Sequence, residues 1–213
     1  MKITTDSILI GSWVEVDGCT DILDVGTGTG IVAMMVAQKA CEGSRITGID
    51  IDGDSAEEAY ENFAASPWPD RLRSEHCSFS EFATKTQPGS FDLIVSNPPF
   101  FDNSLKSPFA RKSAARHSDT LPPEELISDS FKLLRENGRL AVILPVDRAS
   151  VFILSALQKG FFLHRECRVR SEENGPVLRE MIEVGKKPIK NVATLTLTLG
   201  GDEHKRQVAE YVY

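Results

Sequence analysis

Two spacings of apolar residues recur along this chain, and each predicts a different kind of element. Short runs of consecutive or alternating apolar residues are typical of buried strands, whereas apolar residues three and four positions apart are typical of helices. The predicted strands cover residues 22–25, 45–50, 72–77, 91–96, 139–144, 163–170 and 192–199. The predicted helices cover residues 31–39, 55–65, 124–135 and 149–158. This alternation predicts an α/β protein with an open, mostly parallel sheet and helices on both faces.

Turn and cap residues refine these boundaries. Asp52 or Asp54 can cap the helix over residues 55–65, because a short polar side chain ahead of a helix accepts hydrogen bonds from its free N–H groups. We expect Asn137-Gly138 to end the helix over 124–135 in a left-handed turn. Residues 171–175 and 185–190 are predicted loops around the last hairpin.

Length and composition fit one globular domain. The 213 residues contain no repeat or composition break, so we expect one domain over residues 1–213. No signal peptide or apolar run long enough to cross a bilayer is recognisable, and the four cysteines lack metal-ligand spacing. We therefore expect a cytoplasmic protein with reduced thiols, no membrane anchor and no metal site, and we expect a monomer.

A glycine-rich loop follows the first predicted strand. Its sequence Asp24-Val25-Gly26-Thr27-Gly28-Thr29-Gly30 has the spacing G-x-G-x-G, whereas a dinucleotide fingerprint would place its third glycine at Ile31. Asp50 ends the next strand, where a carboxylate can accept hydrogen bonds from both ribose hydroxyls of an adenosine, although helix capping is an alternative role. Asp24 would repel a pyrophosphate and attract a cation. The loop therefore indicates a positively charged nucleoside cofactor and disfavours an oxidoreductase.

A second motif, Asn97-Pro98-Pro99-Phe100, follows the strand over residues 91–96. The amino group of adenine is a poor nucleophile, because its lone pair is delocalised into the ring. The Asn97 side-chain oxygen and the Pro98 carbonyl can accept its N–H bonds and favour the pyramidal nitrogen of a transition state. The prolines stiffen this turn, and Phe100 can stack on a flipped base. A rigid turn is the alternative, which the glycine loop upstream disfavours.

Charge is unevenly distributed along the chain. The net charge of −7 argues against strong nonspecific binding of nucleic acid, yet residues 103–118 contain no acidic residue. This segment carries Lys106, Arg111, Lys112 and Arg116 directly after the second motif, where such a stripe can contact backbone phosphates. A solvated loop is the alternative. Three arginines on the strand over 163–170 can extend the stripe, namely Arg165, Arg168 and Arg170.

The glycine loop resembles motif I of class I S-adenosylmethionine-dependent methyltransferases, and Asn97-Pro98-Pro99-Phe100 is similar to the (Asn/Asp)-Pro-Pro-(Tyr/Phe/Trp) motif of amino methyltransferases. The resemblance implies S-adenosyl-L-methionine as cofactor, S-adenosyl-L-homocysteine as product, and Asn97, Pro98 and Phe100 as catalytic residues. It also implies a Rossmann-like, mostly parallel seven-stranded sheet with helices on both faces and a C-terminal antiparallel hairpin.

The same resemblance implies contacts to each part of the cofactor. The glycine loop would line its methionine part, Asp50 its ribose and Ile51 its adenine face. Ser78 and Phe79 stand where the family often has an acidic and an apolar adenine contact, and Ser78 departs from that pattern. The implied cofactor-binding residues are Thr5, Asp6, Asp24, Gly26, Thr27, Gly28, Gly30, Asp50, Ile51, Ser78, Phe79 and Asn97.

Three further strings resemble one subgroup, the bacterial tRNA(Val) adenine-N6 methyltransferases. They are Thr5-Asp6-Ser7-Ile8-Leu9-Ile10-Gly11-Ser12-Trp13, in which Ser7 replaces a glycine, Asn62 with Ser66-Pro67-Trp68 and Arg71, and Ala115-Arg116-His117-Ser118. The resemblance spans nearly the whole chain, although both termini look truncated. It implies methylation of the adenine beside the anticodon (position 37), with tRNA as partner and an opening segment that closes over the cofactor. The implied substrate-binding residues are Pro99, Lys106, Arg111, Lys112, Arg116 and His117.

Other functions fit parts of this pattern. One is methylation of guanine N2 in ribosomal RNA. Another is methylation of glutamine N5 in release factors, whose enzymes prefer tyrosine after the two prolines and usually carry an extra N-terminal domain. A third is a non-catalytic subunit that binds the cofactor. Proteins that have lost catalytic activity tend to lose the asparagine or the glycine loop, so the presence of both Asn97 and the loop disfavours this function. Ser66-Pro67-Trp68 favours the tRNA enzymes over the first two alternatives.

Overall fold

Alternating apolar residues give the sheet two buried faces. In β1 (Asp21–Val25), Ile22 packs into one buried cluster and Leu23 into a second, because successive side chains of a strand point to opposite faces. The computed structural model describes residues 4–98 and 121–211. The other strands are β2 (Arg45–Asp50), β3 (Leu72–His76), β4 (Phe91–Ser96), β5 (Leu134–Pro145), β6 (Phe162–Arg170), β7 (Val177–Gly185) and β8 (Ala193–Thr198).

The sheet has the order β3-β2-β1-β4-β5-β7-β6-β8. The first five strands of this order pair in parallel, and β7 lies antiparallel between β5 and β6. The expected C-terminal antiparallel hairpin is therefore confirmed. The edge strand β8 pairs in parallel with β6.

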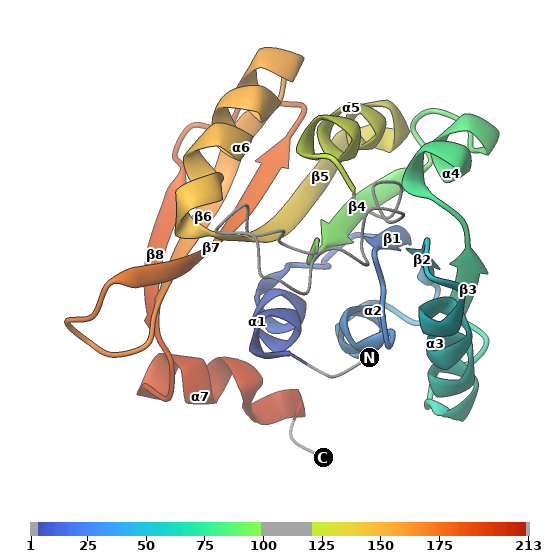
Figure 1. Ribbon diagram of the computed structural model, residues 1–213, viewed down its shortest axis with the longest axis horizontal. Coiled ribbons are helices and arrows are strands. Elements are labelled where there is room, and N and C mark those ends of the chain that lie inside the picture. Colours follow the sequence, from blue (N-terminus) through green and yellow to red (C-terminus); the bar gives the residue numbers. More distant parts are fainter. Residues whose placement is uncertain (1–3, 99–120, 212–213) are drawn as a thin grey trace, which may run out of the picture.

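Two layers of helices enclose the sheet (Figure 1). The helices α1 (Thr5–Trp13), α2 (Ile31–Lys39) and α3 (Gly53–Ala65) bury side chains in one cluster on one face. The helices α4 (Phe79–Lys85), α5 (Pro123–Leu133) and α6 (Val146–Lys159) bury theirs in the second cluster on the other face. A last helix, α7 (Asp202–Val208), precedes a single turn over Ala209–Tyr211. Among the described residues, each helix is too short or too polar to cross a membrane.

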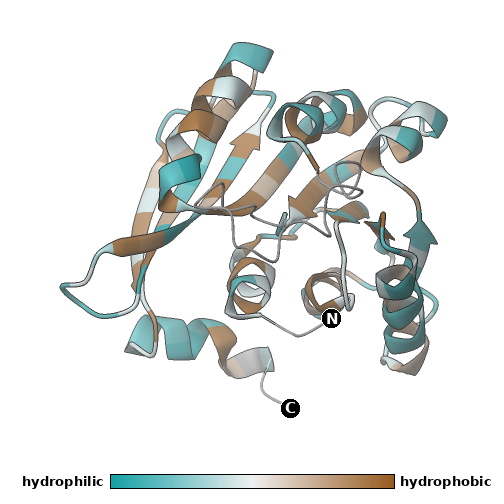
Figure 2. Ribbon diagram, viewed as in Figure 1, coloured by the Kyte–Doolittle hydropathy of each residue, from teal (hydrophilic) through white to brown (hydrophobic). Residues whose placement is uncertain are grey.

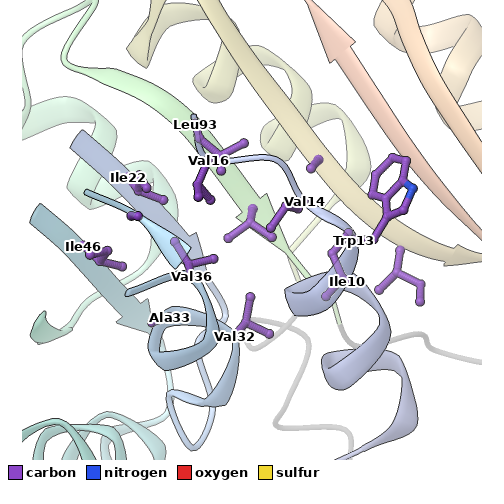
Figure 3. Packing of buried hydrophobic residues seen from close by; sticks show 14 of the residues in the cluster. Ile10, Trp13, Val14, Val16, Ile22, Val32, Ala33, Val36, Ile46 and Leu93 are labelled. Carbon is purple, nitrogen blue, oxygen red and sulfur yellow. The ribbon is translucent and has the colours of Figure 1, made fainter. Parts of the chain in front are cut away.

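The cluster under α1 and α2 ties the start of the chain to the centre of the sheet. Figure 3 shows Ile22 of β1 and Leu93 of β4 close to Val36 of α2 and to the segment that carries Val14 and Val16. In Figure 2 the central strands are mostly apolar and the edge strand β3 is mostly hydrophilic. The helices α3 and α7 are also mostly hydrophilic, as expected for helices with a broad solvent-facing side.

Neighbouring elements hold α1 at both ends. Thr4 is its N-cap, and the Thr4 Oγ1 accepts a hydrogen bond from the Ser7 N–H at 3.1 Å. At the other end the Lys39 Nζ donates to the carbonyls of Ser12 at 3.1 Å and Val14 at 2.5 Å, which satisfies acceptors that a helix C-terminus leaves free. The Arg165 guanidinium of β6 lies 4.2 Å from the centre of the Trp13 ring. Helix α1 is thus fixed to α2 and to the sheet.

The expected count of seven strands is wrong, because β7 is an eighth. Its charged residues break the apolar pattern on which strand prediction depends. Glu183 is almost fully buried, and its Oε1 lies 3.6 Å from the Arg139 Nη1 of β5 and 3.5 Å from the Arg165 Nε of β6. Ion pairs across the strands therefore take the place of apolar contacts in this part of the sheet.

The expected left-handed stop at Asn137-Gly138 is also wrong. Helix α5 already ends at Leu133, and β5 begins at Leu134 and runs through Gly138, which does not have a positive φ. The β4–β5 register shifts in this part of the strand. A Cβ on Gly138 would lie 3.0 Å from the backbone N and O of Arg135, so the glycine is required by close packing of an irregular strand.

We predict that Gly30→Ala destabilises the protein more than Gly18→Ala. Both glycines have a left-handed φ (80° and 74°), which costs an alanine about 1–2 kcal/mol. A Cβ on Gly30 would also lie 2.3 Å from the Phe63 Cε1, whereas a Cβ on Gly18 meets nothing within 4 Å. Overpacking against Phe63 should add about 1–3 kcal/mol to the loss of unfolding free energy. Urea unfolding of both variants measures the difference, and equal losses would contradict the close packing at Gly30.

Candidate active site

The glycine loop and the second motif meet at the carboxyl ends of neighbouring strands. β1 and β4 pair in parallel with Val25 opposite Ser96, so Gly26 and Asn97 leave the sheet side by side. The Ser96 Oγ donates a hydrogen bond to the Val25 carbonyl at 2.8 Å in a buried position. This is the point where the strand order reverses, which is the usual ligand site of an open α/β sheet.

Backbone conformation explains the glycines of the loop. Gly26, Gly28 and Gly30 have φ of 73°, 56° and 80°, values that L side chains rarely adopt. A Cβ on Gly26 would meet nothing within 4 Å, so the loop is open to a ligand on this side. At Gly30 the loop instead packs against the ring of Phe63.

Several hydrogen bonds fix the loop on the sheet. The N–H groups of Gly26 and Thr27 both donate to the Ile49 carbonyl, at 2.9 and 3.0 Å. The Asn62 Nδ2 of α3 donates to the Thr29 carbonyl at 2.9 Å. Asn62 belongs to a string that resembles the tRNA enzymes, and its contact shows that it holds the loop in place.

Asp24 is a buried carboxylate beside this loop. Its side chain is 1% exposed, and its Oδ2 accepts a hydrogen bond from the Thr27 Oγ1 at 2.7 Å. Burial raises the pKa of Asp24 to about 7; the Thr27 and Ala33 hydrogen bonds oppose this shift, and the charge of Asp50 adds to it. Among the described residues no lysine or arginine forms an ion pair with Asp24. The position therefore fits a ligand that brings its own positive charge.

Asp50 stabilises the loop from the end of β2. Its Oδ2 accepts a hydrogen bond from the Gly28 N–H and its Oδ1 from the Asp52 N–H, each at 2.9 Å. The helix cap is Asp52, whose Oδ2 accepts hydrogen bonds from the N–H and the hydroxyl of Ser55 at the start of α3. The capping alternative thus holds for Asp52, and Asp50 keeps further lone pairs for a ligand hydroxyl.

The expected adenine-side residues lie in three different environments. Ile51 is 42% exposed at the end of β2, as an apolar ligand contact would be. Ser78 is the N-cap of α4, where its hydroxyl and the Glu81 carboxylate form a capping box. Phe79 is 4% exposed and packs in the core on the α4 face. These contacts give Ser78 and Phe79 roles in the fold, and their expected cofactor contacts stay predictions.

Asn97 faces the first turn of α1. Its Nδ2 donates a hydrogen bond to the Ser7 Oγ at 3.0 Å and lies 3.5 Å from the Thr4 Oγ1. The Asp6 carboxylate in the same turn accepts a hydrogen bond from the Arg179 Nε of β7 at 2.8 Å. The opening segment thus lies beside the second motif, and its exposed residue Thr5 extends the same turn. Sequence reasoning gave Ser7 and Arg179 no role, because both contacts join residues far apart in the chain.

The structure describes only part of the expected substrate-binding region. Pro98 is buried directly after Asn97. Seven expected residues lie outside the described residues: Pro99, Phe100, Lys106, Arg111, Lys112, Arg116 and His117.

Two of the three arginines expected to extend the basic stripe are paired with acids. Arg165 forms ion pairs with Glu15 and with the buried Glu183. The Arg168 Nε lies 2.7 Å from the Glu166 Oε1. The Arg170 Nη1 donates to the Glu173 carbonyl at 3.4 Å in the exposed turn that follows β6. Arg165 and Arg168 therefore contribute little unpaired positive charge to this surface.

Comparison with known proteins identifies the family. The family model "Methyltransferase small domain" matches residues 6–161. A relative from Parabacteroides distasonis is 38% identical over 205 residues, which cover 96% of this chain and 85% of the relative. A relative from Trichodesmium erythraeum is 40% identical over 92% of this chain and 83% of its own length. Both carry the name tRNA1(Val) (adenine(37)-N6)-methyltransferase. The chain belongs to this methyltransferase family.

Solved structures confirm the expected fold of this family member. A predicted O-methyltransferase from Agrobacterium tumefaciens superposes with a TM-score of 0.67 at 18% identity, over 93% of this chain and 90% of its own. A TehB-like SAM-dependent methyltransferase from Corynebacterium glutamicum gives 0.54 at 19% identity, over 87% and 89%. These similarities establish the Rossmann-like methyltransferase architecture.

We predict that the methyltransferase loses stability as pH rises from about 4 to about 7, through Asp24. The pKa of Asp24 is about 7 in the folded chain and 3.8 in the reference state, so the folded chain binds this proton more tightly. The contribution of this proton to the unfolding free energy is complete below the reference pKa of 3.8 and is lost as pH rises through the folded pKa of about 7. The side chain of Asp24→Asn stays neutral at every pH. Between pH 4 and 8, the unfolding free energy of this variant should therefore rise by a few kcal/mol relative to that of the native chain.

The measurement is urea unfolding of the ligand-free protein across this pH range. Asp70→Asn is the matched control, because it removes an exposed carboxylate just before the start of the edge strand β3, whereas Asp24 lies near the carboxyl end of β1. An Asp24→Asn advantage that does not change with pH would show that the carboxylate is charged throughout.

Proposed function

We propose that this chain transfers a methyl group from S-adenosyl-L-methionine to N6 of adenine 37 in tRNA1(Val). The observation that carries the proposal is the convergence of Asn97 and the Asp24 loop at one point of the sheet, in a member of this family. Asp24 suits a cationic cofactor, and Asn97 suits an amino group as acceptor of the methyl.

The residues around the loop fit S-adenosyl-L-methionine. The buried Asp24 would attract its amino and sulfonium charges, and the space above Gly26 would admit its methionine part. Asp50 would accept hydrogen bonds from the ribose hydroxyls, and the exposed Ile51 would contact the adenine. Thr27 would act indirectly, because its hydroxyl already donates to Asp24.

When bound, this cofactor would supply an electrophilic methyl group to the N6 lone pair, while sulfur would keep the S–C electron pair and N6 would release one proton. The Asn97 Oδ1 and the Pro98 carbonyl would accept hydrogen bonds from N6 and orient its lone pair toward the methyl. Such acceptors favour the charge that develops on N6 during attack.

We extend the proposal to the tRNA and to the setting of the enzyme. Phe100 and Pro99 would hold the flipped adenine, and Lys106, Arg111, Lys112, Arg116 and His117 would contact the phosphates around it. The relatives are named for a tRNA substrate, which supports this assignment. We propose a monomer that works in the cytoplasm, where tRNA is modified.

We predict that the chain methylates unmodified tRNA1(Val) transcripts at adenine 37. Transfer of labelled methyl groups, followed by nuclease digestion and mass spectrometry, locates the product. A transcript with guanine at position 37 is the matched control and should accept no label. Ribosomal RNA and a release factor, tested in parallel, cover the two rival functions, and methylation of either in place of the tRNA would contradict the proposal.

We predict that Asn97→Ala lowers the methyl-transfer rate by at least about 100-fold, since one oriented acceptor at a reacting centre contributes about 10²–10³. Binding of S-adenosyl-L-methionine, measured by calorimetry, should change far less, because Asp24 and Asp50 hold most of the cofactor. An equal loss of rate and of cofactor affinity would contradict the catalytic role of Asn97.

A further inference from the structure

We infer that Ser7 is a positioning residue for methyl transfer, because its hydroxyl fixes which end of the Asn97 amide faces the substrate. The inference rests on the proposed function, in which the Asn97 oxygen accepts a hydrogen bond from the target amino group. The observation is the 3.0 Å hydrogen bond from the Asn97 Nδ2 to the Ser7 Oγ, between β4 and α1.

The two ends of an asparagine amide have opposite hydrogen-bonding character. The oxygen accepts and the nitrogen donates, and rotation of the amide by 180° exchanges them with little change in shape. The terminal torsion of asparagine is broad, so local backbone geometry alone does not select one orientation. With the nitrogen facing the target, two N–H donors would oppose each other and the attack would lose its acceptor. An active site that depends on Asn97 therefore needs a contact that holds the nitrogen elsewhere.

The hydrogen bonds around Ser7 favour its hydroxyl as the group that holds the Asn97 nitrogen. The Thr4 Oγ1 lies 2.9 Å from the Ser7 Oγ and accepts the Ser7 N–H at 3.1 Å. When the Ser7 hydroxyl proton lies on the bond to Thr4, the Ser7 Oγ presents only lone pairs to Asn97. The partner must then be the donor end of the amide, Nδ2, which leaves Oδ1 as the acceptor for a substrate.

Helix α1 is rigid enough for this task. Thr4 caps its first turn, the Asp6–Arg179 ion pair joins that turn to β7, and Lys39 holds the last turn. Leu9 and Ile10 are 1% and 0% exposed, which anchors the helix between the two ends. A side chain on a fixed element positions its partner better than one on a loop.

The test compares Ser7→Ala, Ser7→Thr and Ser12→Ala. Ser7→Ala removes the nearer acceptor of Nδ2 and leaves the Thr4 Oγ1 at 3.5 Å, whereas Ser7→Thr restores a hydroxyl. Ser12→Ala removes a hydroxyl from the last turn of the same helix, where it contacts Leu9 and Gln207. We expect Ser7→Ala to lower the single-turnover methylation rate by about 3–10-fold, the value of one neutral hydrogen bond. The Kd for S-adenosyl-L-methionine and the KM for tRNA should stay within about twofold, as one bond to Asn97 contributes to neither.

Rescue by the conservative variant separates positioning from folding. Ser7→Thr should recover most of the rate, and Ser12→Ala should keep it. A Ser7→Ala rate equal to that of Ser12→Ala would overturn the inference. A parallel loss of rate and cofactor affinity would do the same, because it would indicate a displaced helix.

A second measurement does not depend on the acceptor. In protein labelled with ¹⁵N-asparagine, the Asn97 side-chain NH₂ protons should exchange with solvent faster in Ser7→Ala than in the native chain or Ser7→Thr. Equal exchange in all three would overturn the inference even if no acceptor were methylated. Faster exchange without methylation of tRNA1(Val) would support the contact with Ser7 and refute the proposed substrate.

Discussion

The parallel pairing of β1 with β4 is the constraint on which the site depends. It places Val25 opposite Ser96, and a buried hydrogen bond between them fixes this register. A shift of one residue would turn each side chain of β4 to the opposite face and separate Asn97 from the glycine loop. Close packing opposes that shift, because the apolar residues of these strands fit against different helices on the two faces of the sheet. The core of the fold and the geometry of the site thus have the same origin.

The site also holds a group that is unfavourable for the ligand-free fold. Asp24 lies almost fully buried with one hydroxyl partner and with Asp50 nearby, and its pKa rises to about 7. A carboxylate in this environment binds a proton or a cation in preference to remaining charged alone. Stability lost at this position is therefore available as affinity for a cationic ligand, and the hydrogen bonds from the loop backbone to Asp50 and Ile49 keep the loop shaped for it.

Sequence patterns predicted the elements whose environment is uniform along their length. β2, β4 and α2 begin and end at the predicted residues; β4 and α2 are short runs of mostly apolar residues that follow Ser90 and Gly30. α1 was not predicted, because it mixes polar and apolar residues without an amphipathic period: Leu9, Ile10, Gly11 and Trp13 bury different sides of the helix against α2 and the sheet. β7 was missed because Glu183 is compensated by arginines on two other strands. Both failures come from contacts between residues far apart in the chain.

The sequence by itself determined the chemistry of the site. The glycine spacing, Asp24, Asp50 and Asn97 are local signals, since each depends on a strand end and the residues next to it. Only the tertiary structure decided how these groups are held: that Asp52 caps α3 while Asp50 holds the loop, that Ser78 caps α4, and that Ser7 holds the Asn97 amide. The physical reason is that a hydrogen-bond partner is selected by position in space, and folding brings together residues such as Ser7 and Asn97, which are 90 positions apart in the chain.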